Sequence, residues 1–270
     1  MSHIRFKQLL PLLAILVCLP ACANQLSPRY QSMPYMENAR HVAQNPAFLR
    51  HQGPPKVYAT TDLKINLFRL AQQGYLLVGY SLAPAECGNL DQAKQTAQEI
   101  GAAIVLIQTR DAKLRGVLDA YPSPPLARTE AKQFEVFAQA LDGQSFAKIG
   151  GKLSPGAPGG ADCVAVFLAK LKTSKIGMLV DAVPSDTKAR LGKNYGRLVF
   201  VVIKGSPAEQ AGISAGDVLL EVNGQKIANN RDLAEALGSC KKRTFTFRIW
   251  RGGTTRTVLV ENVKLSAPHE

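Results

Sequence analysis

The stretch GSPAEQAGISAGDVLLEVNGQKI, residues 205–227, constrains the fold more than any other part of the chain. Ser206 is placed to cap a short helix, and Pro207 follows at the first helical position, where a missing N–H costs nothing. Residues 218–222 are apolar apart from one glutamate and predict a strand. Asn223–Gly224 then predicts a tight hairpin turn. The glycines between these elements are expected to shape the backbone rather than to contact a ligand.

The elements around this stretch occur in a recognisable order. KIGM (175–178) comes first, followed by GRLVFVVIKGSPAEQAGI, AGDVLLEVNGQKI, NNRDLAEAL and the hairpin TFTFRIWRGGTTRTVLV. Together they resemble a PDZ domain of the bacterial type found in high-temperature-requirement serine proteases and site-2 proteases. The resemblance covers residues 174–266. It implies a partly open β-barrel or sandwich with two short helices, 206–212 and 230–238.

The same resemblance implies a peptide-binding site. In PDZ domains the end of a partner chain adds a strand to a sheet edge, and backbone N–H groups of a loop hold its terminal carboxylate. By position, the loop is residues 175–178, the edge strand begins at Met178, and the facing helix is residues 230–238. The residues implied are Lys175, Ile176, Gly177, Met178, Leu179, Val180, Asn230, Ala234 and Leu237. The alternative for Ile176, Met178 and Leu237 is an ordinary role in the core.

Residues 56–173 predict a small α/β domain, which makes the whole chain an α+β protein. Thr61 and Gly74 are placed to begin and end a helix, and YLLVGY (75–80) predicts a buried strand. A helix over 89–101 and a strand over 102–108 follow, so this segment predicts a βαβ unit with parallel strands. RTEAKQFEVFAQALDG (128–143) fits either helix or strands, residues 153–162 predict a loop, and CVAVFLAKLK (163–172) predicts a further strand.

The first 55 residues predict export and attachment. Residues 1–21 have a basic start and an apolar core of signal-peptide length, too short to span a bilayer. LPACA (19–23) resembles a bacterial lipobox, which implies lipidation of Cys22 and an outer-membrane lipoprotein facing the periplasm. The alternative is cleavage after Ala23, which gives a secreted periplasmic protein. Residues 22–55 are polar and proline-containing and predict a tether.

Charge and cysteine content narrow the range of partners. The net charge of +13 fits either an anionic neighbour, such as a lipid headgroup or a polysaccharide, or an ordinary solvated surface, which is the more common case. No run of five Lys or Arg and no helix-turn-helix or zinc-finger pattern occurs, so nucleic acid is not expected. No C-x-x-C motif occurs, and neither a metal nor a cofactor is predicted. Cys87 and Cys163 are the expected disulfide pair in an oxidising compartment.

The sequence does not predict an enzyme. GYSLA (79–83) imitates a nucleophile elbow at Ser81, but Ala83 replaces the final glycine, and no H-E-x-x-H motif occurs. We therefore expect a cell-envelope PDZ adaptor that binds C-terminal or extended peptides of other envelope proteins. The alternatives are a component of a secretion or envelope-assembly machine, and an enzyme with an unrecognised site in residues 56–173.

Overall fold

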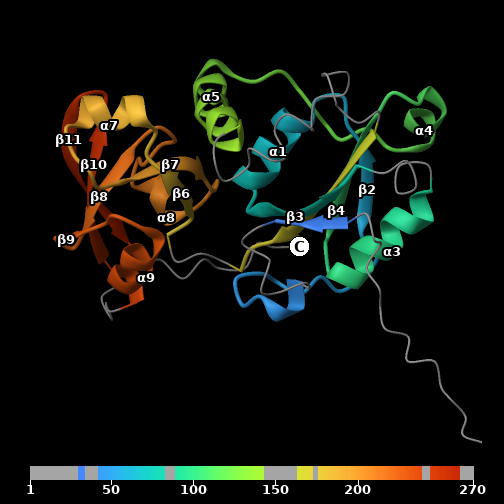
Figure 1. The fold of residues 1–270 in the computed structure, drawn as a ribbon, viewed down its shortest axis with the longest axis horizontal. Coiled ribbons are helices and arrows are strands. Elements are labelled where there is room, and N and C mark those ends of the chain that lie inside the picture. The colour runs from blue at the N-terminus through green and yellow to red at the C-terminus, as the bar shows by residue number, and fades with distance from the viewer. Residues whose placement is uncertain are drawn as a thin grey trace, which may run out of the picture.

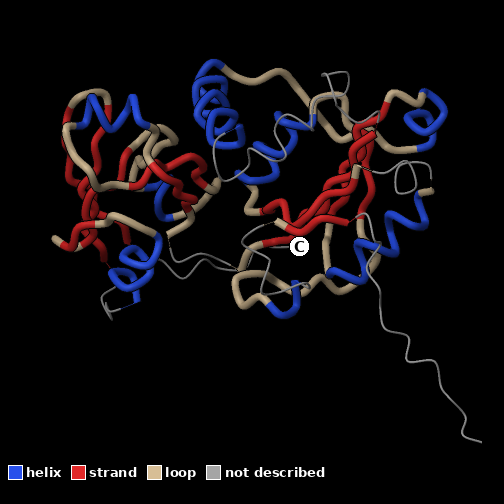
Figure 2. The backbone as a smooth tube through the Cα atoms, in the orientation of Figure 1, coloured by secondary structure: helices blue, strands red, loops and turns tan. Residues whose placement is uncertain are grey.

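The computed structural model describes residues 30–33, 42–82, 89–142, 163–172, 176–238 and 244–261. These residues form two β-sheets, each with its own helices, and the two domains lie side by side (Figures 1 and 2). The predicted α+β class is therefore confirmed. The first 29 residues, with Cys22, lie outside the described part, as do Cys87 and Lys175.

In the described part of the N-terminal domain, a five-stranded sheet has the order β1-β3-β5-β4-β2. Its strands are β1 (Tyr30–Ser32), β2 (Lys56–Ala59), β3 (Tyr75–Ser81), β4 (Ile104–Thr109) and β5 (Cys163–Lys170). β2 and β4 pair in parallel, whereas β5 is antiparallel to both β3 and β4. β2, β3 and β4 therefore run in one direction.

The predicted βαβ unit is present as β3, α3 and β4, but its two parallel strands are separated in the sheet. β3 and β4 do point the same way, but they are not neighbours, because β5 lies between them. Seven of the eight β5 residues are buried, so this strand gains most by occupying the centre of the sheet. β4 finds its parallel partner in β2, a four-residue strand that the sequence analysis did not predict.

Helices cover both faces of this sheet (Figure 1). They are η2 (Val42–Gln44), α1 (Leu63–Gln72), α3 (Leu90–Ile100), α4 (Ala112–Val117) and α5 (Arg128–Asp142). Asp62, rather than the predicted Thr61, caps α1, because its carboxylate accepts the Ile65 N–H at 2.9 Å. Phe68 of α1 packs against Phe137 of α5 with ring centroids 5.5 Å apart, which fixes these two helices on one face.

The described parts of the predicted tether belong to the domain. β1 pairs with β3, and Phe48 forms a bridge with Leu171. Met33, Val42 and Phe48 are buried in the N-terminal core. For residues 30–33 and 42–55 the tether prediction is therefore wrong. These apolar residues are widely and irregularly spaced, so each fills its own gap in the core without producing a periodic pattern.

In the described part of the C-terminal domain, the second sheet has the order β11-β10-β8-β7-β6, and β9 also pairs with β8. Its strands are β6 (Met178–Ala182), β7 (Arg197–Val202), β8 (Val218–Val222), β9 (Gln225–Lys226), β10 (Thr244–Arg251) and β11 (Thr254–Glu261). Asn223 and Gly224 have φ of 50° and 82° and form the predicted turn.

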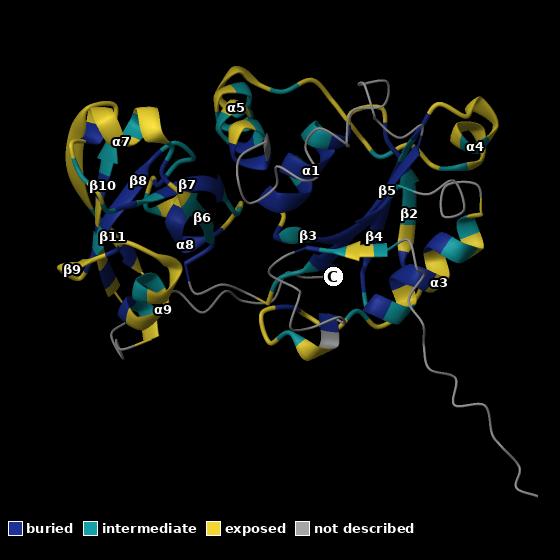
Figure 3. Ribbon diagram, in the orientation of Figure 1, coloured by how far each residue is buried: buried dark blue, intermediate teal, exposed yellow. Residues whose placement is uncertain are grey.

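Three helices accompany this sheet in the described residues. The two predicted helices are α8 (Pro207–Gln210), capped by Ser206, and α9 (Asn230–Gly238), while α7 (Ser185–Leu191) was not predicted. The sheet separates two apolar clusters, so β8 is buried on both faces, and only Glu221 of that strand reaches the solvent. Figure 3 shows that the central strands of both sheets, among them β5 and β8, are largely buried.

The two domains share a packed interface. Leu179, Phe200 and Val201 of the C-terminal domain join the N-terminal core, and the rings of Phe137 and Phe200 stack with centroids 6.4 Å apart. The Lys204 N–H donates to the carbonyl of Gln72 at 2.8 Å. Side-chain packing and a backbone hydrogen bond therefore hold β7 against α1 and α5.

Replacing Phe200 with leucine tests this interface. The smaller side chain leaves Phe137 without its stacking partner, and we expect the chain to lose about 1 kcal/mol of stability. Denaturant unfolding of the full chain measures the loss, and Phe247→Leu, which alters the core of the C-terminal domain alone, is the control. Only Phe200→Leu should also increase proteolysis between the domains; equal proteolysis of both variants would contradict the interface.

Candidate functional site

β6 is the edge strand of the C-terminal sheet. Its five residues pair with β7 on one side, Met178 opposite Val202 and Ala182 opposite Arg197. In the described residues no strand lies on its other side. Four residues of β6 are half-buried and one is exposed. β6 is therefore more accessible than its neighbours β7 and β8. An unpaired sheet edge is the feature to which an extended segment can add as a further strand.

The turn before β6 is held by α8 and the residues that precede it. The Gly177 carbonyl accepts the Ile203 N–H at 2.8 Å and the Ser206 hydroxyl at 3.1 Å, and the Ile176 carbonyl accepts the Ala208 N–H at 2.9 Å. Gly177 has φ of +80°, and a Cβ added to it would lie 2.1 Å from the Ser206 Cβ. Only glycine fits this position.

The side chain of Ile176 is buried in the core of this domain. This is the core role given above as the alternative to a place in the peptide pocket. Lys175, the first residue of the predicted carboxylate loop, lies outside the described residues. The structure thus describes Ile176, Gly177 and Met178 of the loop and shows them in one continuous turn into β6.

Helix α9 presents apolar side chains to the same core cluster as β6. Ala236 is buried, and Leu233 and Leu237 are half-buried against this cluster, as are Met178 and Val180. Asn230 and Ala234 are exposed. Leu237 is half-buried like Leu233, whereas Ala236 faces the core.

A cavity of about 250 Å³ joins β6, α9 and the N-terminal domain. Val180 and Asp181 of β6 and Asn230 of α9 form one side. The other side is apolar and belongs to α1, β3 and α5, with Leu67, Ala71, Tyr75, Leu76, Leu77, Phe137 and Leu141. Sequence reasoning missed this wall, because its residues lie in a different domain and carry no motif.

The structure does not support Ser81 as a nucleophile. Its side chain is fully buried at the end of β3, which pairs with both β1 and β5. His51 Nε2 lies 3.2 Å from the Pro54 carbonyl oxygen. Within the described ranges, no group of three or more His, Cys, Asp or Glu side chains is arranged to hold a metal ion.

Two further observations concern the export prediction. Cys163 is disulfide-bonded, as expected for an oxidising compartment, whereas its predicted partner Cys87 lies outside the described residues. Among the helices that the structure describes, none is both long and apolar enough to cross a membrane.

Comparison with known proteins identifies the C-terminal domain. Residues 177–262 match the family model described as PDZ domain. A probable periplasmic serine endoprotease, DegP-like, from Marinomonas sp. (strain MWYL1) is 32% identical over 94 residues, which cover 34% of this chain and 20% of the relative. Its counterpart from Rhizobium meliloti (strain 1021) is 35% identical over 89 residues, covering 32% of this chain and 18% of the relative.

Solved structures of similar proteins include the HtrA3 PDZ domain bound to a phage-derived ligand (FGRWV). It is 22% identical, covers 32% of this chain and 81% of its own, and has a TM-score of 0.28. The chain spans about a fifth of the length of the two proteases named above. Residues 177–262 of this chain are therefore a PDZ domain, with homologues among the DegP-like proteases.

Proposed function

We propose that this PDZ domain binds C-terminal or extended peptide segments of other envelope proteins by adding them as a strand to β6. The observation that carries the proposal is the open edge of β6, whose Met178 and Val180 share an apolar cluster with Leu233 and Leu237 of α9. A peptide strand at this edge gains backbone hydrogen bonds from β6 and apolar contacts from both elements.

In this proposal the end of the peptide lies at the turn before β6. The turn, residues 175–178, supplies backbone N–H groups for the terminal carboxylate, and Gly177 lets the two backbones approach closely. Met178 and Leu237 contact the last side chain of the peptide, and a flexible methionine accommodates several apolar side chains there. Leu179, Val180, Asn230 and Ala234 lie along the upstream part of the peptide.

The N-terminal domain contributes to the same site. The cavity at Val180 and Asn230 is closed on its far side by Tyr75, Leu76 and Phe137. A peptide that continues upstream along β6 therefore meets apolar side chains of the N-terminal domain. This predicts a preference for a large apolar residue a few positions before the chain end.

The proposed location is the cell envelope. The relatives are named as periplasmic proteases, and the export signal predicted over residues 1–21 of this chain fits the same compartment. In this proposal Cys22 carries the lipid that anchors the protein to the outer membrane, and the PDZ domain acts as an adaptor without chemistry of its own. Cys22→Ser is expected to release the protein from membranes in fractionated cells; undiminished membrane association would contradict the anchor.

A peptide screen tests the binding function. The full chain is screened against displayed random C-terminal peptides, and the best peptide is then synthesised with a free and with an amidated end. We expect amidation to weaken binding about tenfold, because charge-assisted hydrogen bonds to the carboxylate are lost. Fluorescence anisotropy measures both affinities.

A pair of leucine variants locates the site. Leu237→Ala is expected to weaken the selected peptide about fivefold, because it removes apolar contact in the groove. Leu259→Ala on β11 is the control, since that side chain is 63% exposed and far along the sheet order from β6. Selection of no peptide, or equal losses for both variants, would contradict peptide binding at β6.

A further inference from the structure

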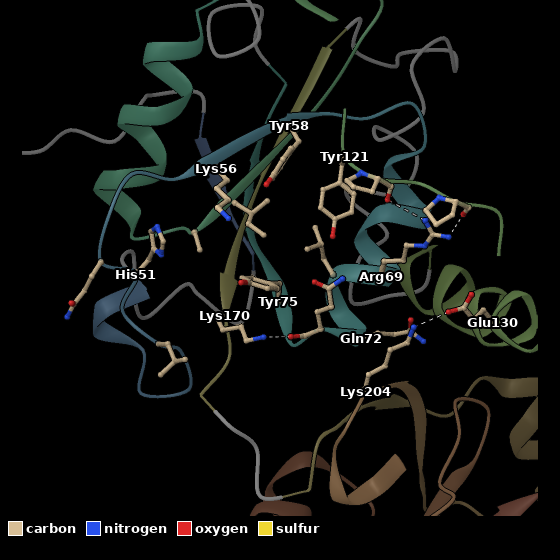
Figure 4. Close-up of a pocket in the computed structure, with 18 of the residues that line it drawn as sticks. His51, Lys56, Tyr58, Arg69, Gln72, Tyr75, Tyr121, Glu130, Lys170 and Lys204 are labelled. Atoms are coloured by element: carbon tan, nitrogen blue, oxygen red, sulfur yellow. Dashed lines mark hydrogen bonds and ion pairs between the residues drawn. The ribbon is translucent and has the colours of Figure 1, made fainter. Parts of the chain in front are cut away.

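A second and larger cavity, of about 840 Å³, lies at the seam of the two domains (Figure 4). Arg50, Lys56 and Tyr58 line it from the segment before β2 and from β2 itself. Arg69 and Gln72 of α1 and Lys204 of the PDZ domain line it from other sides (Figure 4). It shares only Tyr75 with the lining of the cavity at β6, so it is a separate site.

The lining of this cavity is strongly cationic. Five Lys and Arg residues line it, namely Arg50, Lys56, Arg69, Lys170 and Lys204, and His51 lies beside them. Among the residues that line it, Glu130 is the one carboxylate, and its oxygen pairs with Lys204 Nζ at 3.0 Å. The chain as a whole has 33 basic and 20 acidic residues. The ratio of basic to acidic residues is therefore higher in the lining of the cavity than in the whole chain. Cations gathered in a concave site raise the local concentration of anions.

These cations differ in how they are held. Lys170 donates to the Gln73 carbonyl and lies 4.5 Å from the centroid of the Tyr75 ring. Burial lowers the pKa of Lys170, so a nearby anion would stabilise its charged form. Arg69 donates to the carbonyls of Pro122 and Pro124 and so fixes the loop that forms one rim.

Two of the cations are uncommitted. In the part of the chain that the structure describes, Arg50 and Lys56 make no ion pair or side-chain hydrogen bond. Both line the cavity and are exposed, and neither packs in a core. They are therefore available to an incoming anion without loss of a contact within the protein.

We propose that this cavity binds a compact polyanion, a ring-sized molecule with at least two phosphate or carboxylate groups. The volume is far larger than a single phosphate needs and lies within the range of small-molecule pockets. Tyr58 and Tyr121, packed edge to face with centroids 5.4 Å apart, form an aromatic wall for the ring. The uncommitted Arg50 and Lys56 face the anionic groups, and Lys204 brings the PDZ domain into the same contact.

Binding of defined anions to the full chain tests this site. The probes are inositol hexakisphosphate, citrate, and vesicles that contain phosphatidylglycerol, measured by calorimetry and by co-sedimentation at low and at physiological salt. We expect a soluble polyanion to bind, more weakly at higher salt because the ions screen the cations. Arg50→Gln with Lys56→Gln is expected to weaken this binding about tenfold.

The matched control is Lys113→Gln with Arg115→Gln on α4, which removes the same charge from an exposed helix without buried residues. It should bind as the unmodified chain does. If vesicles bind and soluble probes do not, and only the cavity variant loses that binding, the polyanion is a lipid headgroup. Equal losses in the two double variants, or binding of none of the three probes, would overturn the proposal.

Discussion

Replacing Gly177 with valine is expected to destabilise the PDZ domain by roughly 3 kcal/mol. Two effects add. Gly177 adopts φ of +80°, where a β-branched residue is strained, and its new Cβ would lie 2.1 Å from the Ser206 Cβ. The overlap is with the residue that caps α8, so the turn, the cap and the start of β6 are disturbed together. Denaturant unfolding of the full chain measures the effect.

A double-mutant cycle separates the two causes. Ser206→Gly alone loses the helix cap and the bond to the Gly177 carbonyl, about 1 kcal/mol. Gly177→Ala should cost less in the Ser206→Gly background than in the unmodified chain, because the overlap with the serine side chain has gone. If the two costs are equal, the contact with Ser206 is not what requires glycine here. A Gly177 variant is for the same reason unsuitable as a test of peptide binding, which Leu237→Ala probes without strain.

Replacing Arg251 with methionine is expected to cost roughly 3 kcal/mol. Asp217 is 1% exposed, and Arg251 donates to its two carboxylate oxygens at 2.5 and 2.6 Å. The Ser214 N–H also donates to this carboxylate, at 2.9 Å. Loss of the guanidinium leaves a buried carboxylate without its counter-ion. The Arg251 side chain is 34% exposed, so water compensates for part of the loss. We therefore expect a loss of stability at the lower end of the range for breaking a buried ion pair.

The same strand supplies the control. Arg248 pairs with Glu221 at 3.1 Å, but its side chain is 47% exposed. Arg248→Met is therefore expected to cost less than 1 kcal/mol. Asp217→Asn combined with Arg251→Met should recover part of the loss, because no uncompensated charge then remains buried. Equal unfolding free energies for the Arg251 and Arg248 variants would contradict a stabilising role for the buried pair.

Much of the PDZ domain was predictable because its signals are local. Ser206 and Pro207 begin α8, and Asn223–Gly224 turns the chain between β8 and β9, as the sequence indicates. Each depends on residues within a few positions of one another, so short-range rules suffice. Within its own turn the Asp217 carboxylate accepts the Ser214 N–H. Its partner Arg251 lies 34 residues away and could not be inferred from the turn.

The N-terminal sheet was less predictable for the opposite reason. Strands β3 and β4 and helix α3 were predicted in place, yet their sheet order was not. β5 inserts between β3 and β4 from more than 50 residues further along the chain. Strand pairing depends on which apolar faces meet, and the periodicity of a single strand does not encode its neighbours.

The sequence by itself determined the PDZ fold of the C-terminal domain, its hairpin turns and the position of the strand proposed to receive a peptide, because these follow from local backbone chemistry and ordered motifs. The tertiary structure alone decided what surrounds that strand. Phe200 and Leu179 pack into the N-terminal core, and this contact places Tyr75 and Leu76 beside Val180. It also adds Lys204 to the lining of the larger cavity, together with Arg50 and Lys56. Both cavities are made by residues far apart in the chain that apolar burial brings together, and burial leaves no local signal for where two domains meet.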